Sequence, residues 1–256
     1  FKGPFSEDPQ ISVKIDELAG ALSASYRDFP LRLQELRGSF EIREDANVEV
    51  HAGGTFQHGG SARVDAHVVR GDLMHIDVRG AAIPVGPSLL DSLPPRARAI
   101  VGDFRPDGGT ADVHVVVDKA HAGALALPTI DVDLNDVRIA HAEAPYPLTA
   151  SGRLRIVPRF PEGARPDDHP DPSRFDVDLD LRAWGDGVVA ATVSGSLSIT
   201  PSGGPFEGAI HAAAEQVALD DRLREALPPA LAEVWAQLSP AGTARDVAVT
   251  IEGPER

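Results

Sequence analysis

The sequence predicts a mainly β protein with a few helices. We expect two tandem repeats of a meandering, strongly curved antiparallel sheet, each followed by a short helix that proline breaks. Three observations lead to this fold class: segments of alternating apolar and polar residues recur along the 256-residue chain, glycine-rich turns separate them, and one helix-strand segment occurs twice. Closed β-sandwich or barrel repeats are the alternative architecture for the same pattern.

The duplicated segment occurs at an interval of 134 residues and aligns without a gap. Residues 86–117 read GPSLLDSLPPRARAIVGDFRPDGGTADVHVVV, and residues 220–251 read DDRLREALPPALAEVWAQLSPAGTARDVAVTI. Both copies contain Leu-Pro-Pro, then Pro-x-Gly, then alternating apolar residues. We therefore interpret them as two copies of one repeat unit.

Each copy predicts two short helices separated by the proline pair, because proline is tolerated in a first helical turn. After the prolines, apolar residues recur at spacings of three and four, which predicts one helical stripe. The stripes are Leu93, Ala97, Ile100, Val101 and Phe104 in the first copy, and Leu227, Leu231, Val234, Trp235 and Leu238 in the second. Such a helix either covers a protein core or acts as a lid over a ligand that is not protein.

The remaining segments predict the strands of each repeat. Phe175 to Arg182 alternates without interruption and is the clearest of them. The stretch from Gly38 to Ile42 matches the stretch from Gly152 to Ile156. We therefore place the first repeat at 1–118 and the second at 119–256, with a Pro- and Asp-rich surface loop inserted at 158–174. Further strands are expected near 11–15, 47–56, 61–69, 73–83, 113–117, 130–134 and 193–199.

Composition excludes several classes of protein. With 39 acidic and 24 basic residues, a net charge of −15 and 5% aromatic residues, the chain lacks the basic and aromatic surface of nucleic-acid-binding proteins. It has no cysteine, hence no disulfide and no thiolate metal site. No run of about 18 apolar residues predicts a membrane span. We expect the chain to be part of a longer protein.

No motif predicts catalysis, a metal centre or a cofactor, so we expect neither an enzyme nor a cofactor. The cluster Asp167, Asp168, His169 and Asp171 has ligand chemistry, but its Pro-rich setting favours a solvated loop. Asp176, Asp178 and Asp180 would share one strand face and need solvent or arginine partners, with Arg153, Arg155 and Arg182 as candidates. Among the histidines, we expect exposed turn residues at His51 and His58, and cross-strand polar partners at His67, His75, His114 and His211.

The predicted apolar face is larger than the predicted helices can cover. Six strands of about seven residues present roughly 650 Å² per repeat. A helix of about 17 residues covers on the order of 250 Å². Soluble monomers rarely expose contiguous apolar patches beyond a few hundred Å². The sheet must therefore close on itself or hold an apolar ligand.

The spacing of aromatic, leucine, proline and glycine residues in the chain resembles that of AsmA/TamB-like envelope proteins, the bacterial relatives of bridge-like lipid transfer proteins. The resemblance rests on two motifs. The first is aromatic-Pro-Leu before a strand with a central glycine, which occurs at Phe29 and at Tyr146 to Gly152. The second is the spacing of Leu-Pro and Pro-x-Gly, which occurs at Leu89 to Gly108 and at Leu223 to Gly242. It implies repeating β-groove units in the bacterial periplasm or cell envelope that bind or conduct lipid acyl chains between membranes.

This resemblance predicts the partners and the site. The partner would be phospholipid or another acyl lipid, with membrane contact only through parts of a parent chain that this sequence lacks, and no nucleic acid. The lid helices would carry the stripes given above. The lipid-facing residues would be Val113, Val115, Val117, Leu154, Ile156, Val177, Leu179, Leu181, Leu197 and Ile199. The alternative is a structural or adhesive β-repeat module without a ligand.

Overall fold

The structure is a computed structural model, and it describes most of the chain. The described residues are 11–15, 24–26, 29–42, 47–69, 74–93, 98, 101–102, 104–119, 127–141, 144–164, 172–200 and 206–253. The Asp167 to Asp171 cluster, Ala97 and Ile100 lie outside these ranges, as does the middle of the 158–174 loop.

The chain is mainly β, as predicted. In order, its strands are β1 (Ile11–Ile15), β2 (Ala24–Tyr26), β3 (Phe29–Ile42), β4 (Val48–Phe56), β5 (Ser61–Val68), β6 (Met74–Pro84), β7 (Thr110–Lys119), β8 (Leu127–Ile139), β9 (Leu148–Arg159), β10 (Arg174–Gly185), β11 (Val188–Ile199), β12 (Glu207–Leu219) and β13 (Gly242–Glu252). The helices with described bounds are α1 (Pro87–Ser92), α3 (Asp221–Ala226) and α4 (Pro229–Leu238).

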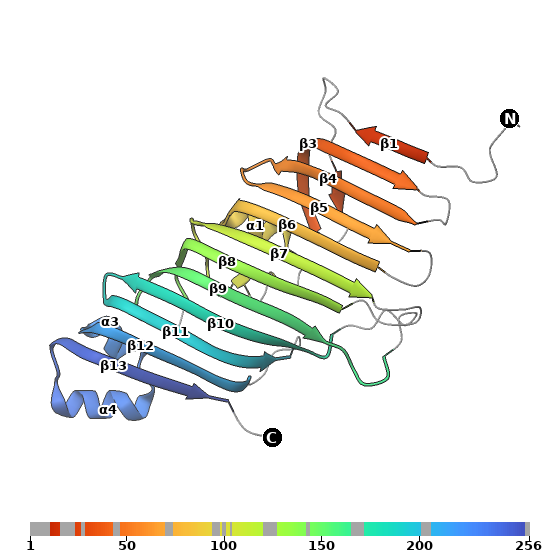
Figure 1. Cartoon of the computed structure of the whole chain (residues 1–256). Helices are drawn as coiled ribbons and strands as arrows, with labels where there is room; N and C mark the ends of the chain where they lie inside the picture. Colours follow the sequence, from red (N-terminus) through yellow and green to blue (C-terminus); the bar gives the residue numbers. More distant parts are fainter. Residues whose placement is uncertain are drawn as a thin grey trace, which may run out of the picture. The chain divides into compact units, whose positions relative to one another are not determined.

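The strands form one meandering sheet in which sequence neighbours pair (Figure 1). The order is β1-β3-β4-β5-β6-β7-β8-β9-β10-β11-β12-β13, and β2 pairs with β3 beside this path. Antiparallel register runs without a shift from β11 through β12 to β13. The sheet is open, because β1 and β13 stand at the two ends of the order. The alternative of a closed sandwich or barrel is therefore wrong: the terminal strands keep one neighbour each.

Two compact units share this sheet. Unit 1 comprises Phe1–Pro84, Asp112–Val132 and Ile156–Phe175, and unit 2 comprises Val85–Ala111, Asp133–Arg155 and Asp176–Arg256. Both contain parts of β8, β9 and β10. The repeat boundary expected between residues 118 and 119 remains a prediction.

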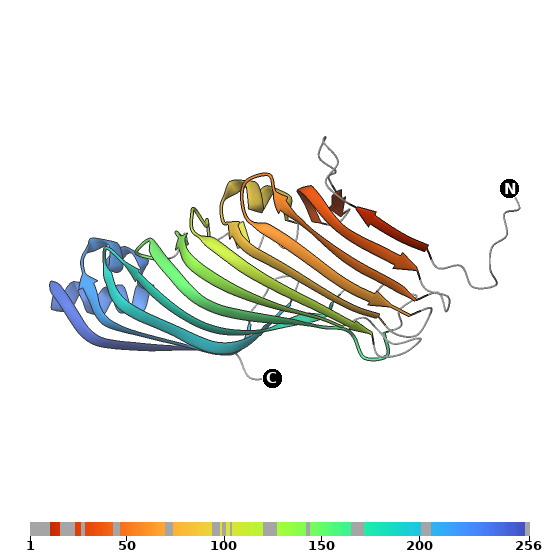
Figure 2. The same ribbon diagram turned by 45° about the horizontal axis from the view of Figure 1, so that its top comes forward.

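Most of the buried hydrophobic residues are alanines. In unit 2 the core cluster consists of Ala150, Ala183 and Ala191, and Ile139, Leu148, Val188 and Ala214 pack against it half-buried. Unit 1 buries Ala62 and Ile83. The larger buried side chains of the described residues are those of Ile83, Val137 and Tyr146. Figure 2 shows strands β10–β13 curving along their length, with α3 and α4 at the end where β12 stops and β13 starts.

Tyr146 contacts both the end of β12 and the N-terminal cap of α3 within unit 2. The residue is 2% exposed, and the single proton of its hydroxyl is shared between two acceptors, the Ala218 carbonyl oxygen at 2.7 Å and Asp220 Oδ1 at 2.8 Å. Asp220 in turn caps α3 by accepting a hydrogen bond from the Leu223 N–H at 3.1 Å. The Arg222 guanidinium lies 4.6 Å from the centre of the Tyr146 ring. The aromatic residue of the Tyr-Pro-Leu motif thus holds the strand-to-helix turn.

Glycine at position 152 is required by the close approach of β10. Its φ is +140°, and a Cβ there would collide with the carbonyl oxygen of Asp180. At Gly38, the matching position in the sequence, a Cβ would collide with the carbonyl oxygen of His51 in β4. The central glycine of the motif therefore lets a neighbouring backbone come near.

We expect Gly152→Ala to destabilise the fold by about 2 kcal/mol or more, because the side chain would add strain at a left-handed φ and displace β10. Thermal unfolding by circular dichroism measures the loss. Gly86→Ala is the matched control, since Gly86 has an extended φ of 171° and a Cβ at this position would meet no other atom within 4 Å. Equal melting temperatures for the two variants would contradict the packing argument.

Candidate functional site

The side chains of strand β10 alternate between an apolar and a polar face of the sheet in unit 2. Val177, Leu179 and Leu181 are half-buried and alternate with acidic residues. Asp178 accepts a hydrogen bond from Ser196 Oγ at 2.5 Å, and Asp176 accepts one from Ser198 Oγ. These contacts place the acidic side chains of β10 and the serines of β11 on the same face. The valine and leucines of β10 therefore lie on the opposite face, together with Leu197 and Ile199.

The apolar face continues across β11, β12 and β13 in register. Val193 pairs with Ala212, which pairs with Val249, and the next row is Gly195, Ile210 and Ile251. Exposure rises toward the last strand, where Val249 is 50% and Ile251 is 51% exposed. A row of apolar side chains thus crosses three strands and ends in solvent.

All ten residues predicted to face lipid are half-buried. Leu154, Val177, Leu179, Leu181, Leu197 and Ile199 belong to unit 2, and Val113, Val115, Val117 and Ile156 belong to unit 1. On β7, His114 contacts Asp77 on the polar side, so its neighbours Val113 and Val115 lie on the other face. Their role in lipid binding stays a prediction.

Most of the large apolar side chains predicted to form the lid helices are exposed. In α4, Leu231 is 53%, Val234 is 49% and Leu238 is 73% exposed, whereas Trp235 is half-buried. In the first copy, Val101 is 37% and Phe104 is 47% exposed. Leu93 and Leu227, both half-buried, are the C-terminal caps of α1 and α3. The exposed stripe of α4 therefore does not pack against the sheet.

The polar face of unit 1 carries an ordered grid of histidine, aspartate and arginine. Register brings His51, Asp65 and Asp77 into one row across β4, β5 and β6, with Arg63 opposite Arg79 in the next row. Two carboxylates directly opposite each other repel. Each is compensated by a two-pronged contact from an arginine on its own strand, Arg63 to Asp65 at 2.7 and 3.1 Å and Arg79 to Asp77 at 3.0 Å twice.

Histidines complete this grid. His51 Nδ1 lies 2.7 Å from Asp65, His114 Nε2 lies 3.1 Å from Asp77, His75 Nδ1 lies 2.6 Å from Asp118 and His67 Nδ1 lies 3.6 Å from Glu49. His211 contacts Thr250 Oγ1 at 3.0 Å in unit 2. The expected cross-strand partners are thus found. The expectation of a turn at His51 was wrong, because it lies within β4; His58 does lie in an exposed turn.

Two carboxylates of the grid, Asp65 and Asp77, have a lowered pKa. The hydrogen bonds from Arg63 and then from His51 lower the pKa of Asp65 to about 2. The pKa of Asp77 is also lowered, chiefly by Arg79 and then by His114. Both aspartates therefore stay charged at neutral pH, and the grid is a balanced set of ion pairs.

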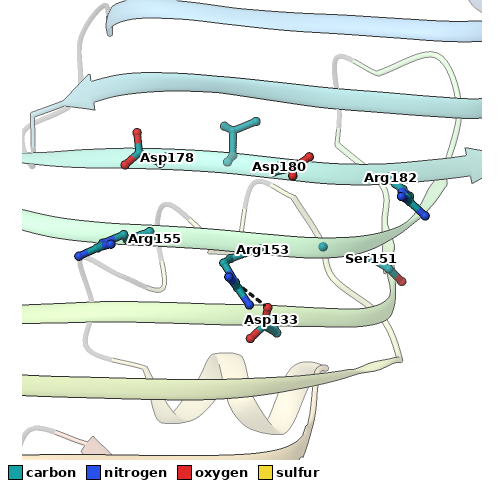
Figure 3. Close-up of a pocket in the computed structure, with 9 residues that line it drawn as sticks. Asp133, Ser151, Arg153, Arg155, Asp178, Asp180 and Arg182 are labelled. Atoms are coloured by element: carbon teal, nitrogen blue, oxygen red, sulfur yellow. Dashed lines mark hydrogen bonds and ion pairs between the residues drawn. The ribbon is translucent and has the colours of Figure 1, made fainter.

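A hollow of about 580 Å³ opens on the polar face of unit 2 (Figure 3). Arg153 Nε donates to Asp133 Oδ1 at 3.0 Å, and Arg155 and Arg182 lie toward opposite ends of the hollow. Of the arginines expected to pair with the β10 aspartates, Arg153 binds Asp133 of β8 instead, and Asp176 and Asp178 accept hydrogen bonds from serines of β11. The residues that line the hollow are Asp133, Ser151, Gly152, Arg153, Arg155, Asp178, Leu179, Asp180 and Arg182.

Charged side chains of both signs line this hollow. Among the described residues, no group of three or more histidine and acidic side chains is placed to hold a metal ion. No described helix has the length and apolar character needed to cross a membrane. Comparison with known proteins found no matching family model, curated protein or solved structure.

We expect Tyr146→Phe to lower stability by about 1–2 kcal/mol, because it removes the hydroxyl proton that the Ala218 carbonyl and Asp220 share. Burial, and then the bond to Asp220, raises the pKa of Tyr146 to about 12. A pKa raised above its usual value of 10 stabilises the fold below pH 10, and this contribution is lost as pH rises from 10 toward 12. Unfolding in denaturant between pH 8 and 12 should show this loss in wild type and not in the variant.

Asp65→Asn should cost on the order of 1 kcal/mol, since the ion pairs it breaks are near the surface. The lowered pKa of Asp65 means that its contribution is present above pH 3.8 and is lost as pH falls toward 2. Wild type should therefore lose its advantage over the variant across that interval in acid-unfolding curves. Asp186→Asn, in the exposed turn after β10, controls for net charge. A constant difference down to pH 2 would rule out this origin.

Proposed function

We propose that this protein binds lipid acyl chains on the apolar face of its sheet, as a segment of an AsmA/TamB-like lipid-handling protein of the bacterial cell envelope. One observation carries the proposal: the large apolar side chains of that face are half-exposed in rows across neighbouring strands, while the most buried side chains are mostly alanines. Apolar surface of this extent is unfavourable in water and marks a binding surface.

The polar and apolar faces of the sheet differ in whether their side chains have partners within the chain. Polar side chains pair across strands by hydrogen bonds and ion pairs, as in the rows through Asp65 and Asp77. On the apolar face, Val193 and Leu197 are half-buried and Val249 is 50% exposed. An acyl chain covers such side chains without polar groups that would need partners. Acyl lipid is therefore the ligand class that this chemistry fits, and the chain acts as a binding protein and not as an enzyme.

Tandem duplication is a part of this proposal. Helices α1 and α3 begin and end 134 residues apart, which is the interval of the sequence repeat. Each ends at a leucine whose N–H bonds to the carbonyl three residues before, Leu93 to Leu90 and Leu227 to Arg224. These agreements support two copies of one unit.

Binding of a fluorescent fatty acid to the purified protein tests the proposal, together with mass spectrometry of lipids that copurify. Val193→Glu places a carboxylate on the apolar face and should weaken binding at least tenfold, because the acyl chain would have to desolvate a charge. Ser194→Glu, the next residue on β11 and on the other face, is the matched control and should leave binding unchanged.

Melting temperatures must show that both variants are folded. Absence of fatty-acid binding to the wild-type protein, or an equal loss in both variants, would refute acyl binding at this face. A folded protein that carries no lipid would instead favour a structural module, whose apolar face is covered by protein.

A further inference from the structure

One row of side chains on the polar face of unit 1 consists mainly of carboxylates and imidazoles. Register places five residues side by side on β1, β3, β4, β5 and β6, namely Ser12, Glu41, Glu49, His67 and His75. None of the five is an arginine or a lysine. In the row beside it, by contrast, Arg63 and Arg79 each bind the aspartate two residues away on the same strand. Imidazole and carboxylate groups are ligands of divalent transition metal ions, so this row has the composition of a metal site.

His67 and His75 stand directly opposite each other on β5 and β6. Residues opposite each other in antiparallel strands have Cβ atoms about 4.5–5.5 Å apart and side chains on the same face. Their side chains are 46% and 54% exposed, so solvent and ions reach both rings. A metal ion such as Zn²⁺ lies about 2 Å from each imidazole nitrogen that binds it. Two opposed imidazoles can therefore bind the same ion.

Each of these two imidazoles has a carboxylate from the next strand outward beside its Nδ1 atom. His67 Nδ1 lies 3.6 Å from Glu49 Oε1 on β4, and His75 Nδ1 lies 2.6 Å from Asp118 Oδ1 on β7. Within the described part of the chain, these are the only hydrogen bonds or ion pairs of the two rings, so both Nε2 atoms are available. A histidine that binds a metal ion usually donates its other ring N–H to a carboxylate, which fixes its tautomer and orientation. The four residues show this arrangement twice, in mirrored order.

His51 and His114 lie on the same polar face but do not form such a pair. They belong to β4 and β7, which β5 and β6 separate in the sheet. Each contacts an aspartate that an arginine also binds. A single metal ion cannot reach imidazoles that are two strands apart. These two histidines therefore provide controls within the same grid.

We propose that His67 and His75 together bind a divalent transition metal ion such as Zn²⁺ through their Nε2 atoms, while Glu49 and Asp118 orient the two rings. The two imidazoles are the only protein ligands, and water fills the other positions of the ion. Such a site agrees with the finding that no group of three or more described histidine and acidic side chains is placed to hold a metal ion. The ion joins β5 to β6 and stabilises the folded state. This inference does not depend on lipid binding.

Isothermal titration of the full, metal-free chain with Zn²⁺ tests the proposal. His67→Gln and His75→Gln should each weaken binding at least tenfold, because each leaves a single imidazole. His51→Gln is the matched control and should leave the affinity unchanged, since His51 is also exposed on this face beside an aspartate. Asp118→Asn should weaken binding about tenfold through the orientation of His75. Asp186→Asn removes the same charge in the exposed turn after β10 and should have no such effect.

Electron paramagnetic resonance of the chain loaded with Cu²⁺ gives a second measurement. Nitrogen couplings from two imidazoles should appear in wild type, and from one in His67→Gln. Circular dichroism establishes that each variant is folded. The proposal is overturned if wild type binds no Zn²⁺, or if His51→Gln weakens binding as much as His67→Gln does. Wild-type affinity in the double variant His67→Gln/His75→Gln would also overturn it, because the ion would then bind adventitiously elsewhere in the chain.

Discussion

The structure depends on hydrogen bonds between neighbouring antiparallel backbones, because a single layer of sheet buries few large side chains. The register through β11, β12 and β13 is continuous, whereas the core cluster of unit 2 consists of alanines. Small residues suit such a sheet: Gly152 lets the Asp180 carbonyl approach, and Gly38 does the same for His51. The stability of each strand is therefore tied to the strand beside it.

This constraint makes the two faces unequal. On the polar face, opposed carboxylates such as Asp65 and Asp77 are neutralised by arginines two residues away on the same strand. These contacts complete the polar side within the chain itself. The apolar side has no equivalent within the described residues, since the exposed stripe of α4 does not pack against it. The proposed acyl ligand would cover this apolar side.

The same constraint gives the ends of the sheet their importance. A strand inside the sheet satisfies its backbone on both sides, whereas β1 and β13 stand at the two ends of the order of the described strands. The junction before β7 is held by Arg138 and Ala140, and the junction before β13 has matching φ angles with Leu238 left exposed. Two junctions with matching backbone geometry thus occur 134 residues apart.

Local patterns in the sequence determined the strands, the helix breaks and the division into faces. The alternation from Phe175 to Leu181 became β10, and Leu-Pro-Pro ends α1 and α3 at Leu93 and Leu227, because these features depend on neighbours in the chain. Cross-strand partners depend on register, which places Arg153 beside Asp133 and Ser196 beside Asp178. Likewise, only the tertiary structure decided that the sheet stays open and that Tyr146 binds Asp220, because these outcomes depend on the pairing and packing of segments far apart in the chain.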